Sequence, residues 1–159
     1  MEFFDQPTLD NIDQYNDAGL RARGGSLLLI ELDGFGIDEQ FTELHDALKA
    51  VGGRVQAETD AAGHALWELR RSGRGFDANT WFAGGDLAVP KSRIPEVYAH
   101  FSEIEARFGV EVSAVAHAGD GNLHPIITLP IPAGADAATP PTTLHDAAGL
   151  PLDLVAEVL

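Results

Sequence analysis

Apolar residues follow two patterns along the chain, and these patterns predict an alternation of helices and strands. Spacings of three and four residues predict helices, whereas short apolar runs predict strands. The predicted helices cover residues 5–18, 37–51, 60–73 and 93–108. The predicted strands cover residues 26–33, 54–58, 86–89, 110–115 and 123–129. Strands interleaved with helices in this way indicate an α+β domain.

Residues 26 to 58 carry a strand–helix–strand pattern. Residues 26–33 are almost uniformly apolar, as expected of a central strand buried on both faces. Gly34 and Gly36 indicate a structural turn rather than a phosphate-binding loop, because the third glycine of such a loop is absent. The apolar face of the next helix is formed by Phe41, Leu44, Leu48 and Val51.

Short polar side chains mark the expected helix starts. Asp5 or Thr8 can cap the first helix, and Ser92 can cap the helix over residues 93–108. The buried stripe of the first helix is expected to comprise Leu9, Ile12 and Tyr15. That of the helix over residues 93–108 is expected to comprise Ile94, Val97, Phe101, Ile104 and Phe108.

The chain divides into three parts. Residues 1–129 are predicted to form the main part of one domain, within which residues 76–85 form a loop anchored by Trp81 and Phe82. Residues 130–142 are rich in proline and alanine and predict a loop. Residues 143–159 predict the start of a further helical segment.

Composition narrows the possible partners. Hydrophobic residues make up 45% of the 159 residues and charged ones 22%, which is typical of a globular domain. A net charge of -15 repels phosphate backbones and anionic lipids, so neither nucleic acid nor a membrane surface is an expected partner. The chain has no cysteine and no membrane-spanning apolar run. A cytoplasmic location is expected, with any membrane association made through a partner.

Candidate chemistry concentrates between the last two predicted strands, in residues 115–124. A loop over residues 118–121 would pair His117 with Asn122 and Val115 with His124, which places both histidines on one face. Gly119 and Gly121 are expected to supply the positive φ angles of the turn. Two converging imidazoles suit a divalent ion such as zinc, manganese or iron. The alternative is a polar hairpin whose histidines only end the strands.

Basic residues form a second candidate site. Five of the ten lysines and arginines fall between Arg70 and Arg93, which favours an anionic ligand such as a carboxylate. The alternative is that these side chains pair with aspartate and glutamate at the surface.

Three stretches carry a family resemblance: His117-Ala-Gly-Asp-Gly-Asn-Leu-His124, Leu66-Trp-Glu-Leu-Arg70 and Asp86-Leu-Ala-Val-Pro-Lys-Ser-Arg-Ile94. In order and spacing they resemble the C-terminal, substrate-binding domain of FAD-linked oxidases. That family includes glycolate oxidase, cytochrome-linked D-lactate dehydrogenases and D-2-hydroxyglutarate dehydrogenase. The resemblance implies an α+β fold of ferredoxin-like type, an antiparallel sheet with helices packed on one face.

The resemblance also implies roles for individual residues. Arg70 would hold a substrate carboxylate with help from Arg74, while His117 and His124 would hold a divalent metal. Asp120 and Asn122 would shape the turn and orient the ligands. No catalytic residue is assigned, because the family's general base belongs to a Glu-His-Gly motif that these residues lack.

The parent protein implied by the resemblance oxidises a 2-hydroxy acid to the 2-oxo acid. FAD would be bound mainly by a domain outside this chain, and electrons would pass to an acceptor protein or a quinone. The chain is therefore expected to be an inactive fragment on its own, with weak metal binding. A metal-free branch of the superfamily is one alternative. A flavin-free organic-acid-binding module with the same fold is another.

Overall fold

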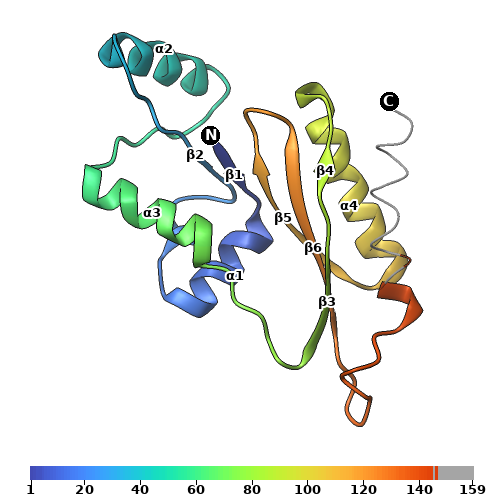
Figure 1. Cartoon of the computed structure of the whole chain (residues 1–159). Coiled ribbons are helices and arrows are strands. Elements are labelled where there is room, and N and C mark those ends of the chain that lie inside the picture. The colour runs from blue at the N-terminus through green and yellow to red at the C-terminus, as the bar shows by residue number, and fades with distance from the viewer. Residues whose placement is uncertain (145, 147–159) are drawn as a thin grey trace.

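An antiparallel sheet runs through the centre of the molecule (Figure 1). The computed structural model describes residues 1–144 and 146. Within them the strands are β1 (Glu2–Phe4), β2 (Leu27–Leu29), β3 (Thr80–Gly84), β4 (Leu87–Ala88), β5 (Glu111–His117) and β6 (Asn122–Pro130). The helices are α1 (Gln6–Asn16), α2 (Ile37–Ala50), α3 (Asp60–Ser72) and α4 (Ile94–Phe108). The sheet order is β2-β1-β5-β6-β3, with β4 paired to β6, which confirms the predicted antiparallel α+β class.

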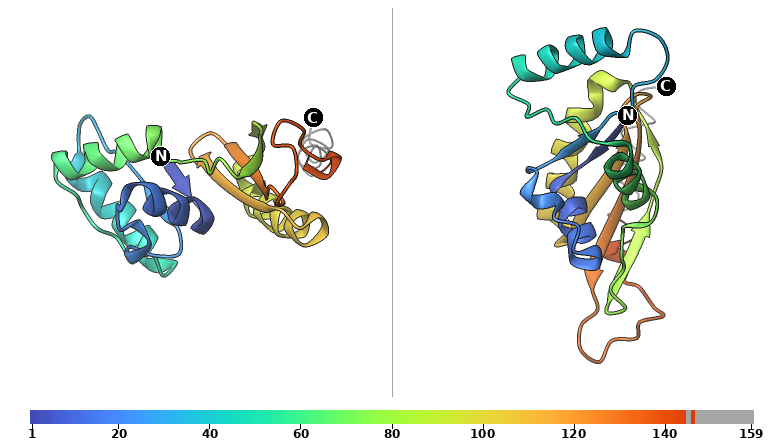
Figure 2. Two further views of the ribbon diagram at one scale, coloured as in Figure 1. Left: turned by 90° about the horizontal axis from the view of Figure 1, so that it is seen from below. Right: turned by 90° about the vertical axis from the view of Figure 1, so that its left-hand side faces the viewer.

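The helices lie on both sides of the sheet, as the two views in Figure 2 show. Alternate residues of β5 point to opposite faces of the sheet. Val112 and Ala114 face α4, where they join a core containing Phe101 and Ile104. Val115 faces the other way and packs with residues of β1, α1 and α3. The helices were expected to pack on one face of the sheet, and α4 does so. Helices α1 and α3 instead pack on the opposite face, beside β1 and β5.

Asp5 determines where α1 begins. Its Oδ1 accepts a hydrogen bond from Thr8 N (2.9 Å), so Asp5 is the cap and Thr8 is not. Its Oδ2 accepts from Ala114 N on β5 (2.7 Å), which ties the helix start to the sheet. Burial raises the pKa of Asp5, and these two hydrogen bonds offset part of that effect. Leu9 and Ile12 are buried as predicted, but Tyr15 is 43% exposed.

We expect Asp5→Ala to lower the free energy of unfolding by about 2 kcal/mol, because it leaves two backbone donors without their acceptor. Urea denaturation at neutral pH measures the change. Asp38→Ala is the matched control, since Asp38 lies exposed in the first turn of α2. Equal losses for the two variants would contradict the tie between α1 and β5.

The predicted strand–helix–strand unit over residues 26–58 is only partly formed. Residues 26–33 were expected to be a central strand, but β2 is a three-residue edge strand because its partner β1 is equally short. Helix α2 forms, yet none of its residues is buried. Residues 54–58 are not a strand, so that prediction is wrong. Strand-forming residues need a neighbour to pair with, and none of the described residues provides one here.

In the second half of the chain, the observed helices and strands agree more closely with those predicted from the sequence. A 3-10 turn over Lys91–Arg93 precedes α4, which shifts the cap to Arg93 and makes the Ser92 prediction wrong. Part of the predicted loop over residues 76–85 is strand β3, whose pairing with β6 the local sequence did not indicate. Trp81 is buried within β3 as expected, whereas Phe82 is 56% exposed.

The last part of the chain extends from the end of β6. Residues 131–141 form no helix or strand, in agreement with the predicted loop. Residues 142–144 and 146 are helical, and Leu144 packs into the α4 core. The rest of the helix predicted over residues 143–159 lies outside the described residues. Among the helices that the structure describes, none has the length and apolar character needed to cross a membrane.

Candidate functional site

The hairpin of β5 and β6 carries the two histidines in the predicted register. His117 pairs with Asn122 and Val115 pairs with His124, which confirms that prediction. The turn is closed by Gly121 N, which donates to His117 O (3.1 Å). Asp120 Oδ1 accepts from Asn122 N (3.1 Å), so Asp120 shapes the turn locally. The role of Asp120 and Asn122 in orienting ligands stays a prediction.

A single glycine supplies the left-handed conformation of this turn. Gly121 has φ of 84°, whereas Gly119 has no positive φ, so the expectation for Gly119 is wrong. A Cβ on Gly121 would lie 2.1 Å from Val89 O, while one on Gly119 would meet nothing within 4 Å. Gly121 is therefore required both by its backbone conformation and by the close approach of the chain after β4.

The two imidazoles face each other across the hairpin. Their ring centroids are 4.9 Å apart and their planes meet at 89°. Both side chains are about one-third exposed, at 36% for His117 and 33% for His124. The predicted placement on one face is confirmed, and the pair remains open to a ligand from solvent.

Glu2 joins His117 to Arg70. Its Oε1 lies 2.6 Å from His117 Nδ1, and its Oε2 accepts from Arg70 Nε (2.7 Å). The Glu2 side chain is 9% exposed and that of Arg70 19%, so water screens this ion pair poorly. Strand β1, helix α3 and strand β5 thus each contribute one side chain to a single cluster.

These contacts assign the hydrogens on both imidazoles. A carboxylate only accepts, so His117 Nδ1 carries the hydrogen that it shares with Glu2. Arg70 Nη2 lies 3.5 Å from the same nitrogen, which is then a packing contact rather than a second hydrogen bond. On the other ring, His124 Nδ1 is paired with Asp86 Oδ1. Nε2 is consequently the nitrogen that each ring offers to a ligand.

Glu2 and Asp86 are partners of the histidines that the sequence pattern did not indicate. Glu2 is 115 residues from His117 along the chain, and no local pattern indicates such a contact. Asp86 opens one of the three family-like stretches, but the sequence indicated it only as the first residue of the predicted strand over residues 86–89.

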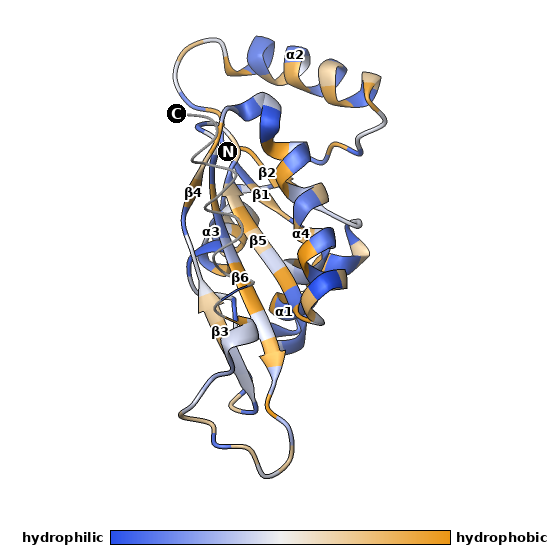
Figure 3. Cartoon of the chain, turned by 90° about the vertical axis from the view of Figure 1, so that its right-hand side faces the viewer, coloured by the Kyte–Doolittle hydropathy of each residue, from blue (hydrophilic) through white to orange (hydrophobic). Residues whose placement is uncertain are grey.

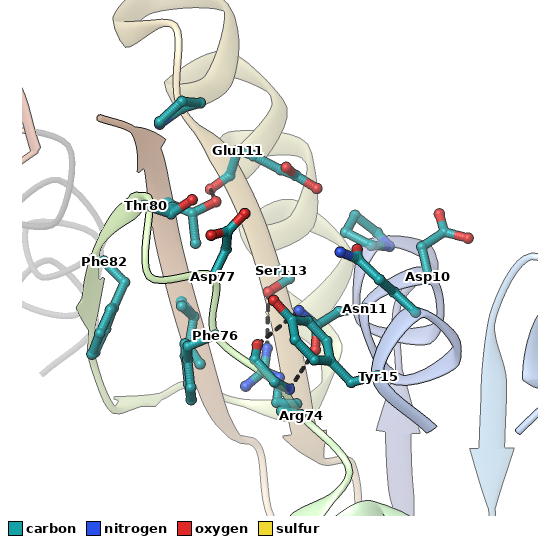
Figure 4. Close-up of a pocket in the computed structure, with 16 residues that line it drawn as sticks. Asp10, Asn11, Tyr15, Arg74, Phe76, Asp77, Thr80, Phe82, Glu111 and Ser113 are labelled. Carbon is teal, nitrogen blue, oxygen red and sulfur yellow. Dashed lines mark hydrogen bonds between the residues drawn. The ribbon is translucent and has the colours of Figure 1, made fainter. Parts of the chain in front are cut away.

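Arg74 lies apart from this cluster. Helix α3 ends at Ser72, so Arg74 is not one turn further along it as expected. Its guanidinium donates to Ser113 Oγ on β5 (2.9 Å) and lines a pocket of about 240 Å³ between α1 and the sheet (Figure 4). Burial lowers the pKa of Arg74, and the Asp5 carboxylate counteracts this in part.

The donor set of the cluster suits part of a metal site. Imidazoles that bind metals through one nitrogen commonly donate from the other to a carboxylate, and both histidines have such a carboxylate. Within the described residues, however, no three histidine, aspartate or glutamate side chains are grouped to hold an ion. The described residues therefore offer two imidazole nitrogens, whereas a catalytic zinc site commonly has three ligands from protein.

Comparison with known families identifies the domain. The model of the family described as FAD linked oxidases, C-terminal domain, matches residues 1–153. The chain belongs to this family. The resemblance stated from the three sequence stretches is thereby confirmed, and the family is one of FAD-linked oxidoreductases.

Two curated relatives agree with this assignment. Glycolate oxidase subunit GlcD of Bacillus subtilis is 36% identical over 137 residues, covering 82% of this chain and 29% of that protein. Glycolate oxidase subunit GlcD of Escherichia coli K12 is 27% identical over 135 residues, covering 80% of this chain and 27% of that protein. The chain thus spans less than a third of the length of these relatives.

Proposed function

We propose that this chain is the substrate-binding part of an FAD-dependent oxidoreductase that oxidises a 2-hydroxy acid to the 2-oxo acid. Acids of the glycolate, D-lactate or D-2-hydroxyglutarate type are the proposed substrates. The observation that carries the proposal is the Glu2-linked cluster, in which the Arg70 cation lies beside the His117 and His124 pair. A 2-hydroxy acid has an anionic carboxylate next to a polar hydroxyl, and this cluster offers a partner for each.

Each residue of the chain has a distinct task in this proposal. Arg70 holds the carboxylate through its Nη groups while its Nε remains bound to Glu2. His117 and His124 present Nε2 toward the 2-hydroxyl group. Arg74 contributes positive charge from the neighbouring pocket. FAD, held mainly by a domain outside this chain, would supply the hydride acceptor, and an acceptor protein or a quinone would receive the electrons.

The histidine pair would hold a zinc, manganese or iron ion through Nε2, with a further ligand from outside this chain. Such an ion would polarise the hydroxyl group and favour transfer of its proton to a base that is not assigned to any residue of this chain. With two protein ligands in place, ion binding by the 159 residues alone is expected to be weak. In this proposal the chain alone does not turn over substrate.

The experiment that tests the proposal uses the purified protein encoded by the complete gene. Its absorption spectrum is recorded, and dye reduction is followed with glycolate, D-lactate, L-lactate and D-2-hydroxyglutarate. The proposal expects flavin absorption that is bleached by one of these acids. A protein that binds these acids without containing flavin would contradict it and would favour an organic-acid-binding module.

We expect Glu2→Gln to weaken zinc binding by the 159-residue chain about tenfold. Glutamine has one accepting oxygen, and its amide nitrogen only donates, so the side chain cannot replace both Glu2 oxygens that meet Arg70 and His117. The His117 ring therefore loses its fixed orientation. Competition with a chromophoric chelator measures the affinity, and ¹⁵N NMR reports the tautomer of His117.

Asp46→Asn is the matched control for Glu2→Gln. Asp46 also lies beside an imidazole nitrogen, that of His45, at 3.1 Å, but this pair is exposed on α2. We expect Asp46→Asn to leave the zinc affinity unchanged. An equal loss in the two variants, or no loss with Glu2→Gln, would show that Glu2 does not position the site.

A further inference from the structure

The pocket of about 240 Å³ between α1 and the sheet (Figure 4) lies on the same face of the sheet as the histidine pair. Ile126 of β6 lines it and follows His124 by two residues, so both side chains point to this face and their Cα atoms are about 7 Å apart. Ser113, the partner of Ile126 on β5, lines the pocket from the same face. A ligand bound at the two histidines can therefore enter this pocket if its carbon chain extends along β6.

Arg74 supplies the positive charge of this pocket. Its Nη2 donates to Ser113 Oγ (2.9 Å) and Thr8 Oγ1 (3.4 Å), while Nε and Nη1 have no hydrogen-bond partner among the described residues. Burial lowers the pKa of Arg74, and the charge of Arg70 lowers it further, so the two guanidinium groups lie near enough for their charges to interact. Arg74 therefore has N–H groups available for a carboxylate that Arg70 also holds.

Hydroxyl groups and aromatic rings form much of the remaining lining. Thr80 of β3 and Thr128 of β6 contribute hydroxyls, and Figure 3 shows bands of intermediate hydropathy between the apolar residues of β5 and β6. Phe76 and Phe82 lie with their ring centroids 4.8 Å apart and are 51% and 56% exposed. Hydroxyl groups both donate and accept hydrogen bonds, and exposed rings offer a flat apolar surface to C–H groups. This lining suits a carbon chain that itself carries hydroxyl groups.

Carboxylate groups in the lining disfavour a ligand with a second anionic group. Asp10, Asp77 and Glu111 line the pocket, against the single cation Arg74. Asp10 forms an ion pair with Arg21, whereas Asp77 and Glu111 form none within the part of the chain that the structure describes. A second carboxylate would meet like charge there, but a hydroxyl group can donate to each of these carboxylates. The pocket therefore favours hydroxyl groups over a carboxylate in the chain of the ligand.

We propose that the preferred 2-hydroxy acid is a sugar acid of four to six carbon atoms, whose hydroxylated chain from C3 onward lies in this pocket. The inference rests on the proposed function and adds the class of substrate. The carboxylate binds Arg70 and Arg74, and the 2-hydroxyl group lies at the histidines. The chain then follows β6 from His124 toward Thr128.

The reaction at C2 is the oxidation of the proposed function. The hydrogen on C2 leaves with its electron pair to the flavin, the proton of the 2-hydroxyl group passes to a base outside the assigned residues, and a 2-oxo sugar acid remains. The carbon chain beyond C2 keeps all its bonds, so the pocket acts on binding and orientation alone. Glycolate, which has no carbon atom beyond C2, would leave the pocket empty.

The test compares glycolate with chiral acids that share the D configuration at C2, using the flavin-containing protein encoded by the complete gene. D-erythronate and D-gluconate carry hydroxylated chains of four and six carbon atoms. Of the other two acids, D-2-hydroxyhexanoate has no further hydroxyl group and D-2-hydroxyglutarate has a second carboxylate. Dye reduction gives kcat/KM for each acid. We expect the better sugar acid to exceed the other three acids about tenfold or more, because its chain adds hydrogen bonds to the pocket.

Thr80→Val removes one hydroxyl group from the pocket, while the β-branched valine preserves the strand. We expect it to lower the ratio of kcat/KM for the sugar acid to kcat/KM for glycolate about fivefold. Thr42→Val is the matched control, because Thr42 is exposed on α2 and does not line the pocket. We expect the control to leave the ratio unchanged.

The outcomes separate this inference from the proposed function. A larger kcat/KM for glycolate, D-2-hydroxyhexanoate or D-2-hydroxyglutarate than for either sugar acid would overturn the inference while supporting oxidation of a 2-hydroxy acid. Reduction of the flavin by none of these acids would contradict the proposed function, and the inference with it. Equal ratios in Thr80→Val and Thr42→Val would show that the chain of the substrate does not bind in this pocket.

Discussion

Gly121→Ala is expected to lower the free energy of unfolding by about 4 kcal/mol, the largest stability loss predicted for this chain. Two costs combine at this position. Alanine disfavours φ of 84°, and its Cβ would lie 2.1 Å from Val89 O, which is backbone and cannot rotate away. Relief of the clash requires the chain after β4 to move, which breaks the hydrogen bond from Val89 N to Gly121 O (3.0 Å). Urea denaturation gives the size of the loss.

Gly119→Ala provides the matched control in the same turn. Gly119 has no positive φ, and a Cβ there meets nothing within 4 Å. Its substitution is expected to be neutral, or to stabilise by up to about 1 kcal/mol through the unfolded state. Gly121→Ala should also affect the histidine site. Gly121 directly precedes Asn122, which pairs with His117, so its substitution should disturb the 4.9 Å histidine pair and weaken zinc binding. Equal stability of the two variants would contradict this account.

The features that could be predicted from the sequence depend on short-range chemistry. The β5–β6 register follows from a four-residue turn between two apolar runs, which predicted the pairs His117–Asn122 and Val115–His124. Helices α1 and α4 follow from apolar residues at helical spacing with polar or glycine residues at their ends. The confirmed approach of His117 to His124 is a direct consequence of that register.

The features that were missed depend on contacts distant in sequence. Glu2 meets His117 across 115 residues and Arg70 across 68, and nothing near Glu2 distinguishes it from a surface acid. Strand β3 forms because β6 is beside it, although its own residues include alanine and glycine. Residues 54–58 show the reverse case. They were predicted as a strand, but a strand does not form without a neighbour to pair with.

Arg70 and Arg71 are adjacent residues of the same type that make different contacts. Arg70 is mostly buried and bound to Glu2, whereas the side chain of Arg71 is 59% exposed and paired with Glu68 on the helix surface. Sequence alone left open whether such arginines hold a ligand or pair with surface acids. The structure gives Arg71 the surface pairing and gives Arg70 a buried partner beside the histidines.

Arg70→Lys is expected to lower kcat/KM for the 2-hydroxy acid about 100-fold in the flavin-containing protein, which corresponds to about 2.7 kcal/mol. The guanidinium can donate from Nε to Glu2 and still offer its Nη groups to a substrate carboxylate. A lysine ammonium keeps the charge, but its donors all lie on one nitrogen, so it lacks the planar fork that holds a carboxylate through two Nη groups while Nε binds Glu2. Under the proposed function, dye-reduction kinetics with whichever acid bleaches the flavin of the full-length protein measure the effect.

The loss from Arg70→Lys should appear mainly as a raised KM, because the carboxylate is held in both the ground state and the transition state. Arg71→Lys is the matched control and should leave both constants unchanged, since its ion pair with Glu68 is solvated. Retained flavin absorption in both variants would show that the protein remains assembled. An Arg70→Lys enzyme with normal KM would mean that the substrate carboxylate binds elsewhere, and Arg74 in the neighbouring pocket would then become the cation to test.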